Sequence, residues 1–253
     1  MTPTEGDRAS SYLVLGASGG IGSALCRRLA AGGARLVVAA RDPGKLEALA
    51  DELGAHPFPL DATRSAQVDA CVARVLERHG RLDGVAHCVG SLLLKPAHLT
   101  SDAEWDEALA VNLVSAFAVV RAAARAMRDS GGSIVLVSSA AARAGIAHHE
   151  AIAAAKAGVI GLVLSAAASY AARGIRVNAV APGLVRTPLT AALTSNATAL
   201  RASAAMHALG RIGEPDDVAS ALARLLDPMQ NWITGQVLGV DGGLAVLRTK
   251  ATA

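Results

Sequence analysis

The stretch YLVLGASGGIG, Tyr12–Gly22, joins a short apolar run to a glycine-rich turn. Aliphatic residues dominate Tyr12–Gly16, as in a buried β-strand. The glycines that follow permit a tight turn, in which backbone N–H groups can approach a phosphate at the positive end of a helix. A strand, a glycine turn and a helix in this order predict nucleotide binding. The alternative is an ordinary turn between a strand and a helix.

The rest of the chain repeats this alternation of short apolar runs and longer helical patterns. Strands are predicted at Tyr12–Gly16, Arg35–Ala40, His56–Leu60, Leu82–Val89, Ser133–Ser139, Ile175–Val180 and Gly235–Val240. Helices are predicted near residues 20–32, 43–53, 65–79, 103–129, 149–172 and 215–227. Alternation without hairpin signals predicts parallel strands joined by crossovers. We therefore expect one α/β domain over residues 1–253, a doubly wound parallel sheet (Rossmann fold) of about seven strands with helices on both faces. Its core spans about residues 12–243, between short flexible tails.

Composition narrows the class of protein. Aromatic residues make up 2% of the 253 residues, so alanine, valine and leucine must fill the core. A net charge of +3 is too small to indicate a nucleic-acid partner. Cys26, Cys71 and Cys88 lack a paired motif and fit a reduced compartment. The N-terminus is polar, and no uninterrupted apolar run approaches the ~20 residues of a membrane span. We expect a soluble, cytoplasmic protein without a membrane partner or a metal site.

The end of the second predicted strand bears on the choice of nicotinamide cofactor. Sites for NAD usually place a carboxylate there, which accepts hydrogen bonds from the ribose 2′-hydroxyl. This chain has Ala40 followed by Arg41. A guanidinium can hold a 2′-phosphate through two hydrogen bonds, so NADP(H) is favoured over NAD(H). The alternative is that Arg41 is an ordinary loop arginine in solvent.

Several further motifs resemble those of the short-chain dehydrogenase/reductase family. The turn has the spacing G-x-x-x-G-x-G, LDAT contains Asp61, and VNLVSAF contains Asn112. NAVAPGLVRTPL, GRIGEPDDVA and ITGQVLGVDGG resemble later parts of the family pattern, and the resemblance runs from about Tyr12 to Gly243. LDGVAHCVG occupies the place of a strand that ends in Asn-Asn-Ala-Gly, and only Gly90 of that motif is kept.

The resemblance implies a set of cofactor-binding residues. Asp61 is expected near the adenine, and the Pro-Gly segment is expected to frame the nicotinamide. The expected set is Gly16, Ser18, Gly19, Gly20, Ile21, Gly22, Arg41, Asp61, Ala62, Gly90, Lys156, Pro182, Gly183, Val185 and Thr187.

The resemblance also implies catalytic residues, with one departure. The family uses a serine, a tyrosine and a lysine, together with an asparagine that supports a proton-relay water. Ser139, Lys156 and Asn112 match three of these. The tyrosine should lie four residues before Lys156, where this chain has Ile152. Isoleucine has no proton to donate, so the standard Ser-Tyr-Lys mechanism is not possible.

No other tyrosine can replace the missing one. Tyr12 begins the first strand, and Tyr170 lies fourteen residues beyond Lys156, roughly 20 Å away along a helix. His149 is seven residues before Lys156 and shares its helix face if the helix has begun by then. We expect His149 or water to act as the acid; the alternative is that HHE only caps the helix. His87 and Cys88 point to opposite faces of a strand, and packing explains both.

Three functions remain open. The first is an NADP(H)-dependent oxidoreductase that acts on a carbonyl or alcohol group, or on an activated C=C bond, of a small molecule with a non-standard proton donor. The second is a catalytically weak or regulatory nucleotide-binding protein, and the third is a lyase or isomerase that uses the same cleft. Residues 187–208 are expected to cover the substrate. In the family the long helices pair across subunits, which implies a homo-oligomer, a dimer or a tetramer.

Overall fold

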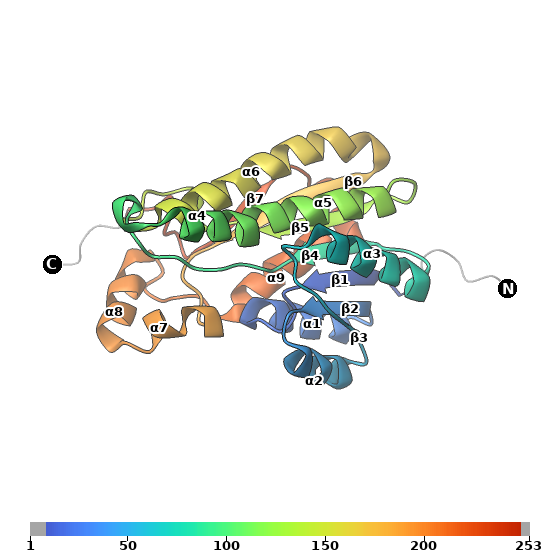
Figure 1. Ribbon diagram of the computed structural model, residues 1–253, viewed down its shortest axis with the longest axis horizontal. Coiled ribbons are helices and arrows are strands. Elements are labelled where there is room, and N and C mark those ends of the chain that lie inside the picture. Colours follow the sequence, from blue (N-terminus) through green and yellow to red (C-terminus); the bar gives the residue numbers. More distant parts are fainter. Residues whose placement is uncertain (1–8, 249–253) are drawn as a thin grey trace.

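The structure, a computed structural model, describes residues 9–248 and contains one parallel sheet of seven strands in the order β3-β2-β1-β4-β5-β6-β7 (Figure 1). The predicted tails lie mostly outside the described residues. The strands are β1 (Ser11–Leu15), β2 (Arg35–Ala40), β3 (His56–Pro59), β4 (Gly84–His87), β5 (Gly132–Val137), β6 (Ile175–Pro182) and β7 (Val237–Val240). The predicted fold class, a doubly wound α/β sheet of about seven strands, is confirmed.

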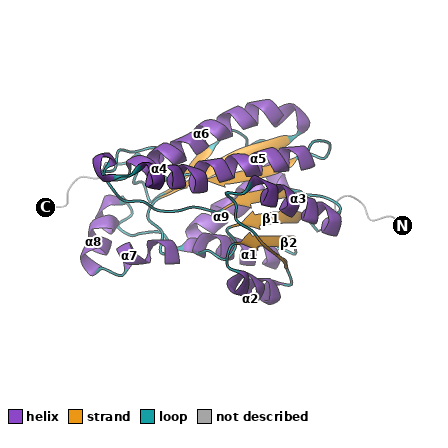
Figure 2. Ribbon diagram, in the orientation of Figure 1, coloured by secondary structure: helices purple, strands orange, loops and turns teal. Residues whose placement is uncertain are grey.

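Helices cover both faces of the sheet (Figure 2). The main helices are α1 (Gly20–Ala31), α2 (Pro43–Leu53), α3 (Ser65–His79), α4 (Asp102–Leu109), α5 (Ser115–Ala126), α6 (Glu150–Tyr170), α7 (Ala191–Thr194), α8 (Ala197–Met206) and α9 (Pro215–Leu226). One core cluster joins the sheet to α3, α5 and α6 through residues such as Val68, Val119 and Val163. A second cluster joins the other face to α1, α2 and α9 through Leu25, Leu46 and Leu222.

Local sequence signals explain where several helices begin and end. Asp42 caps α2 by accepting a hydrogen bond from the N–H of Lys45, and Pro43 follows as the first helical residue. Gly54 ends the same helix in the left-handed conformation. Ser101 and Glu104 form a reciprocal capping box at the start of α4. All the strand pairs are parallel, so the carboxyl ends of the strands lie at the same edge of the sheet.

Most predicted boundaries differ from the observed ones by one or two residues, and three differences are larger. The single helix expected at 103–129 contains a π-helical turn, Ala110–Val114, between α4 and α5. Strand β4 is four residues long, although a run of eight was predicted. Residues 187–208, for which no helix was predicted, contain α7 and α8. Alanine-rich helices without a wide apolar stripe carry little periodic signal, which explains this omission.

The strand order places a topological switch point beside β1. Strand β1 pairs with β2 on one side and with β4 on the other, so the crossovers leave in opposite directions. In open parallel sheets, ligands bind beyond the carboxyl ends of the strands at such a point. The glycine turn after β1 and the segment after β4 both lie there.

Two helical stretches, residues 102–126 and Glu150–Arg173, are long and apolar enough by length and composition to cross a membrane. In their apolar windows, 61% and 44% of the residues are buried inside the protein. The sequence reading expected no such stretch because single polar residues such as Asn112 interrupt each run. Both stretches pack against the sheet, and core helices of this kind satisfy the same test.

Candidate active site

The glycine turn after β1 brings three strands' ends together. Gly16 has φ +76°, and a Cβ there would lie 2.7 Å from the carbonyl of Cys88, just after β4. A Cβ on Gly22 would overlap the carbonyl oxygen of Gly16. The N–H groups of Gly16 and Ala17 both donate to the carbonyl of Ala39 in β2. Glycine is therefore required at 16 and 22, because the backbone passes too close for a side chain.

The first turn of α1 has backbone N–H groups that are not used by a side-chain cap. Its N-cap, Gly19, is extended and supplies no side-chain cap. The first backbone N–H groups of a helix have no acceptor within the helix, and they carry the positive end of its dipole. A Cβ on Gly20 would lie 2.8 Å from Cγ2 of Thr187, so the segment after β6 closes on this turn. This arrangement fits a phosphate-bearing ligand.

Arg41 and Asp61 lie beside each other at the ends of β2 and β3. Arg41 is exposed, and its charge helps to lower the pKa of Asp61. The larger cause of that lowered pKa is the N–H and hydroxyl of Thr63, which both donate to Asp61 Oδ1. Ala62 is 4% exposed and packs in the core, so only its backbone can face a ligand.

Lys156 is hydrogen-bonded through its side chain to strand β5 and through its backbone to the residue after that strand. Its side chain is buried, 5% exposed, and Nζ donates to the carbonyl of Val137 at 2.8 Å. Its own carbonyl accepts a hydrogen bond of 2.9 Å from Ser138 Oγ. Burial lowers the pKa of Lys156 to about 8, and the neighbouring Cys88 opposes this shift. The ammonium is thus held just beyond the end of β5.

Ser139 lies two residues after the end of β5, at the carboxyl edge of the sheet. It is partly exposed, and its Oγ accepts a hydrogen bond from the N–H of Ala141. Ile152 lies one turn before Lys156 on α6 and is 4% exposed. The structure therefore places an apolar side chain where the sequence reading expected the family's tyrosine. That equivalence stays a prediction.

His149 is the N-cap of α6, whose first helical residue is Glu150, and its backbone angles, φ −113° and ψ 15°, are not helical. It therefore lies at the boundary of the helix, and its place on the Lys156 face stays a prediction. Its carbonyl accepts from the N–H of Ala153, and its Nδ1 donates to the carbonyl of Ala147. In this tautomer the remaining ring nitrogen, Nε2, is a hydrogen-bond acceptor. His148 precedes it in the loop, with φ +64°.

The side chain of Asn112 makes hydrogen bonds within the protein that the sequence did not predict. Its Nδ2 donates to the carbonyl of Ala108 and to Ser91 Oγ, both at 2.9 Å. Its Oδ1 accepts from the N–H of Ser91 at 3.2 Å. A Cβ on Gly90 would lie 3.2 Å from that Oδ1 and 3.6 Å from Lys156 Nζ. Asn112, Gly90 and Lys156 are therefore brought together, although they are far apart in the sequence.

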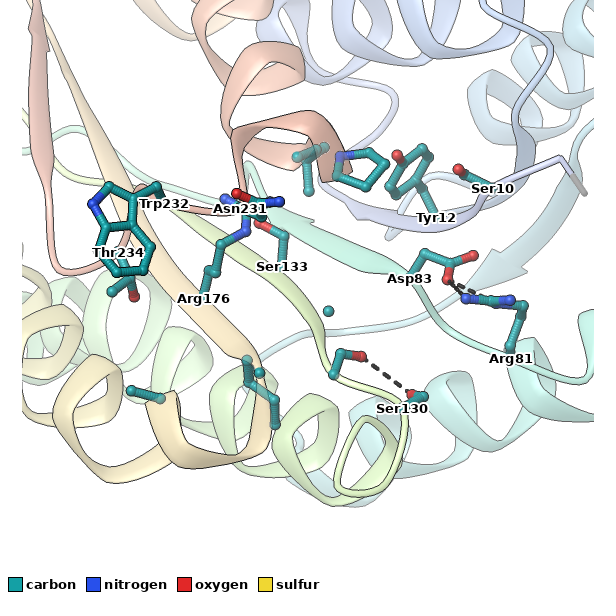
Figure 3. Close-up of a pocket in the computed structure, with 17 residues that line it drawn as sticks. Ser10, Tyr12, Arg81, Asp83, Ser130, Ser133, Arg176, Asn231, Trp232 and Thr234 are labelled. Carbon is teal, nitrogen blue, oxygen red and sulfur yellow. Dashed lines mark hydrogen bonds and ion pairs between the residues drawn. The ribbon is translucent and has the colours of Figure 1, made fainter. Parts of the chain in front are cut away.

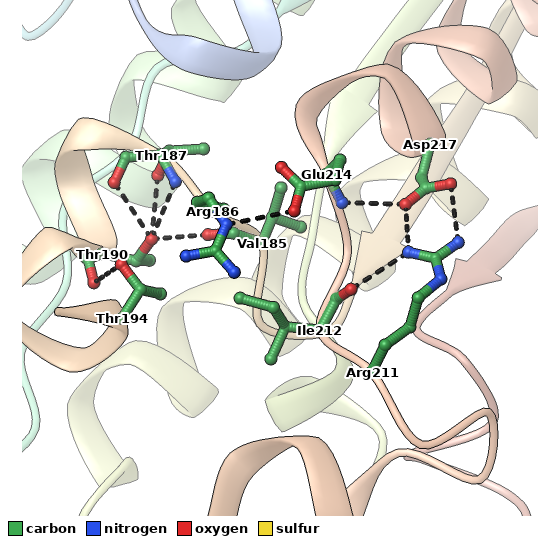
Figure 4. Close-up of polar contacts among 9 residues, drawn as sticks. All are labelled: Val185, Arg186, Thr187, Thr190, Thr194, Arg211, Ile212, Glu214 and Asp217. Atoms are coloured by element: carbon green, nitrogen blue, oxygen red, sulfur yellow. Dashed lines mark hydrogen bonds and ion pairs between the residues drawn. The ribbon is translucent and has the colours of Figure 1, made fainter. Parts of the chain in front are cut away.

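The segment after β6 is tied to α9 and to itself (Figure 4). Thr190 Oγ1 donates to the carbonyl of Val185 and accepts from the N–H of Thr187. Arg186 pairs with Glu214 at 3.1 Å, at the start of α9. Pro182 and Val185 are buried, and the N–H of Gly183 donates to the carbonyl of Val240. These contacts hold the segment that connects β6 to α7 and α8.

Sequence reasoning missed Ser91 and Ser138, because their partners lie 21 and 18 residues away. The doublet Ser138-Ser139 was the only available signal.

Tyr12 lies at the amino edge of the sheet, opposite the glycine turn, where it lines a cavity of about 620 Å³ (Figure 3). Tyr170 is the last residue of α6. Among residues 9–248, no group of three His, Cys, Asp or Glu side chains is arranged to hold a metal.

Known proteins resemble this chain over almost its whole length. Residues 16–245 match the family described as enoyl-(acyl carrier protein) reductase. The 3-oxoacyl-(acyl-carrier-protein) reductase of Thermotoga maritima is 35% identical over 248 residues, with 92% of this chain and 97% of the relative covered.

Solved structures also resemble this chain over almost its whole length. A short-chain dehydrogenase/reductase from Mycobacterium ulcerans superposes with a TM-score of 0.91 at 35% identity, covering 94% of this chain and 90% of that one. ElxO with NADP bound superposes with a TM-score of 0.88 at 26% identity, covering 94% and 99%. With the glycine turn, the anchored lysine and the strand order in place, the chain belongs to the short-chain dehydrogenase/reductase family.

Proposed function

We propose that this protein is an NADP(H)-dependent oxidoreductase that acts on a carbonyl or alcohol group, or an activated C=C bond, of a small molecule. The observation that carries the proposal is the position of Lys156 Nζ. It lies between the Val137 carbonyl and Gly90, at the edge of the sheet where the carboxyl ends of the strands meet. The similarity to a 3-oxoacyl-(acyl-carrier-protein) reductase and to ElxO with NADP bound supports it.

The residues present fit a nicotinamide dinucleotide. The uncapped start of α1 and the missing Cβ atoms at 16 and 22 suit a pyrophosphate, and Arg41 suits a 2′-phosphate. Ser18 and Ile21 follow β1, Asp61 follows β3, and Gly183 and Thr187 follow β6, so each comes after the carboxyl end of a parallel strand. When bound, such a cofactor supplies or removes a hydride at the carbon of the substrate.

The chain's own residues must manage the oxygen and the proton. We expect the hydroxyl of Ser139, a partly exposed residue, to donate to a substrate oxygen. The positive charge of Lys156 favours a developing alkoxide or enolate nearby. Ile152 donates nothing, so the proton must come from His149 or from water. Activated C=C bonds need less proton donation at this point, which makes them suitable substrates.

A second candidate function follows from Ile152 itself. A buried isoleucine in place of an acid lowers the expected rate, because general acid catalysis contributes about 10²–10⁴-fold. This second candidate is a catalytically weak or regulatory nucleotide-binding homologue, or a lyase or isomerase that uses the same cleft.

We further expect a single-domain, cytoplasmic protein that forms a dimer or tetramer and binds neither nucleic acid nor membrane. Cys26, Cys71 and Cys88 are free thiols, which suits a reducing compartment. Phe117 and Leu164 are about half exposed on α5 and α6, where a subunit contact would cover them.

Binding and turnover separate the two candidates. The purified protein is titrated with NADPH and NADH, and NADPH oxidation is then followed with 3-oxoacyl thioesters, simple ketones and enoyl thioesters. The oxidoreductase predicts tighter NADPH binding and slow turnover of at least one class, which Ser139→Ala abolishes. Binding without any turnover supports the second candidate, and failure to bind either nucleotide overturns both.

A further inference from the structure

His87 is a fully buried side chain that the proposed reaction does not use. It is the last residue of β4 and is 0% exposed. Its Nε2 lies 2.9 Å from Ser115 Oγ, on the first turn of α5. Ser115 Oγ in turn donates to the carbonyl of Val111 at 2.6 Å. The chain of contacts therefore runs from the sheet into the π-helical turn Ala110–Val114.

The hydrogen atoms in this chain of contacts can be assigned. A serine hydroxyl has one hydrogen, and Ser115 donates it to Val111. His87 Nε2 must then be the donor to Ser115, and Nδ1 is a bare acceptor. Within the described chain that Nδ1 has no hydrogen-bond partner. Burial, and then the charge of Lys156, lowers the pKa of His87 to about 3, so the ring stays neutral.

A π-helical turn needs partners for the carbonyls that its wider spacing displaces. Here Asn112 Nδ2 serves the carbonyl of Ala108, while Ser115 serves that of Val111. Asn112 also binds Ser91 through two further hydrogen bonds. The loop from His87 to Ser91 is thus fastened to the same turn at both of its ends. A Cβ added to Gly90, which lies between them, would be 3.2 Å from Asn112 Oδ1 and 3.6 Å from Lys156 Nζ.

We propose that His87 is a positioning residue, which through Ser115 holds the π-helical turn and the loop 87–91 in the register that the cofactor cleft requires. The inference rests on the proposed function only for its cofactor readout. Its structural part, the fastening of the loop to the turn, stands independently of any reaction.

Substitutions can separate positioning from general stabilisation. His87→Leu removes the donor to Ser115, and Ser115→Ala removes the relay from the other side. His87→Gln is the conservative rescue, because an amide nitrogen at the end of the Gln side chain can replace Nε2. The matched control is His79→Leu, since His79 Nδ1 lies 2.7 Å from Ser11 Oγ in a similar His–Ser pair at the amino edge of the sheet.

Two measurements are made on all four variants: amide hydrogen exchange of the segments around Ser91 and 110–115, and the dissociation constant for NADPH. We expect His87→Leu and Ser115→Ala to speed exchange in both segments and to weaken NADPH binding about tenfold. His87→Gln restores both values, and His79→Leu changes neither. If His87→Leu does not fold, Ser115→Ala and His87→Gln decide the matter.

The outcomes are distinct. If exchange and NADPH affinity in His87→Leu and Ser115→Ala match those of the wild type, or change equally in the His79→Leu control, the proposal is wrong. If the wild type itself does not bind NADPH, the proposed function fails. In that case hydrogen exchange alone still tests whether His87 fastens the loop.

Discussion

Lys156 Nζ donates a hydrogen bond of 2.8 Å to the carbonyl oxygen of Val137, the last residue of β5. One of the three ammonium hydrogens is thereby used by the protein, and the others remain for a ligand. The bond also holds the charge near the end of the strand from which Ser139 follows. The lysine is therefore positioned by the sheet and by its own helix, independently of any residue at position 152.

Supplying a phenol at position 152 should raise activity. We expect Ile152→Tyr to increase the kcat of carbonyl reduction by about 10²-fold or more, because general acid catalysis is worth about 10²–10⁴-fold. The rate of NADPH oxidation measures this. Ile152→Phe, with the ring and no hydroxyl, is the matched control and should give no increase. Equal rates for the two variants would show that the pocket serves another chemistry.

The burial of Lys156 predicts how stability changes with pH. Its pKa falls from the ordinary value near 10.5 to about 8 in the folded protein, so the unfolded chain binds the proton more tightly. The free protein should gain stability as pH rises from about 8 to about 10.5, by on the order of 3 kcal/mol. Denaturant unfolding at several pH values measures the gain. Lys156→Met should abolish this gain and be more stable than the wild type at pH 7.

The same pKa predicts a pH dependence of cofactor affinity. The ammonium is charged below about pH 8 and loses its charge above it. If it holds the cofactor, the wild type should bind NADPH more weakly as pH rises through about 8, and a fluorescence titration across that range measures this. In Lys156→Met, binding should be weak and independent of pH there. A flat profile for the wild type would mean that Lys156 does not contact the cofactor in its charged form.

Arg41 should set the preference between the two nicotinamide cofactors. Removing one charge-assisted phosphate contact costs about 1.5–3 kcal/mol, or roughly 10- to 100-fold. We expect Arg41→Ala to weaken NADPH binding by this factor and to leave NADH binding unchanged, as measured by titration with each. Lys45→Ala is the control, because Lys45 is an exposed cation near the start of α2 that already pairs with Asp42. Equal losses for both cofactors would argue against a 2′-phosphate contact.

His149 and its neighbour provide a test of the proton donor. His149→Ala should lower kcat by about 10-fold or more and leave the NADPH dissociation constant unchanged, because an acid acts in the reaction and not in binding. His148→Ala, in the preceding loop, should change neither. If both variants keep the wild-type kcat, water supplies the proton.

Much of the fold follows from local pattern. The run of apolar residues before Gly16 and the glycines after it predict strand, turn and helix within eleven residues, and the structure agrees. Asp42 with Pro43 marks the start of α2. By contrast, α8 has no buried residue and its sequence lacks a clear apolar stripe, so periodicity could not predict it.

The candidate site was predictable only as a set of positions. Ser139, Lys156 and Gly90 could be named from spacing and resemblance, since each matches a motif. The hydrogen bonds between the Asn112 amide and Ser91 could not be predicted. They join residues that are 21 apart in the sequence, and Asn112 lies in a π-helical turn. The contact between His87 and Ser115 was missed for the same reason, and packing alone was expected there.

The sequence by itself determined the alternation of strands and helices, the glycine turn, and an isoleucine one helical turn before a lysine. These are local properties, set by side-chain periodicity and by the conformations that glycine and proline allow. Only the tertiary structure decided what each polar group meets: Val137 for Lys156, Ser91 for Asn112 and Ser115 for His87. Those pairs depend on how distant segments pack against one another, and buried polar groups must find partners wherever the packed chain provides them.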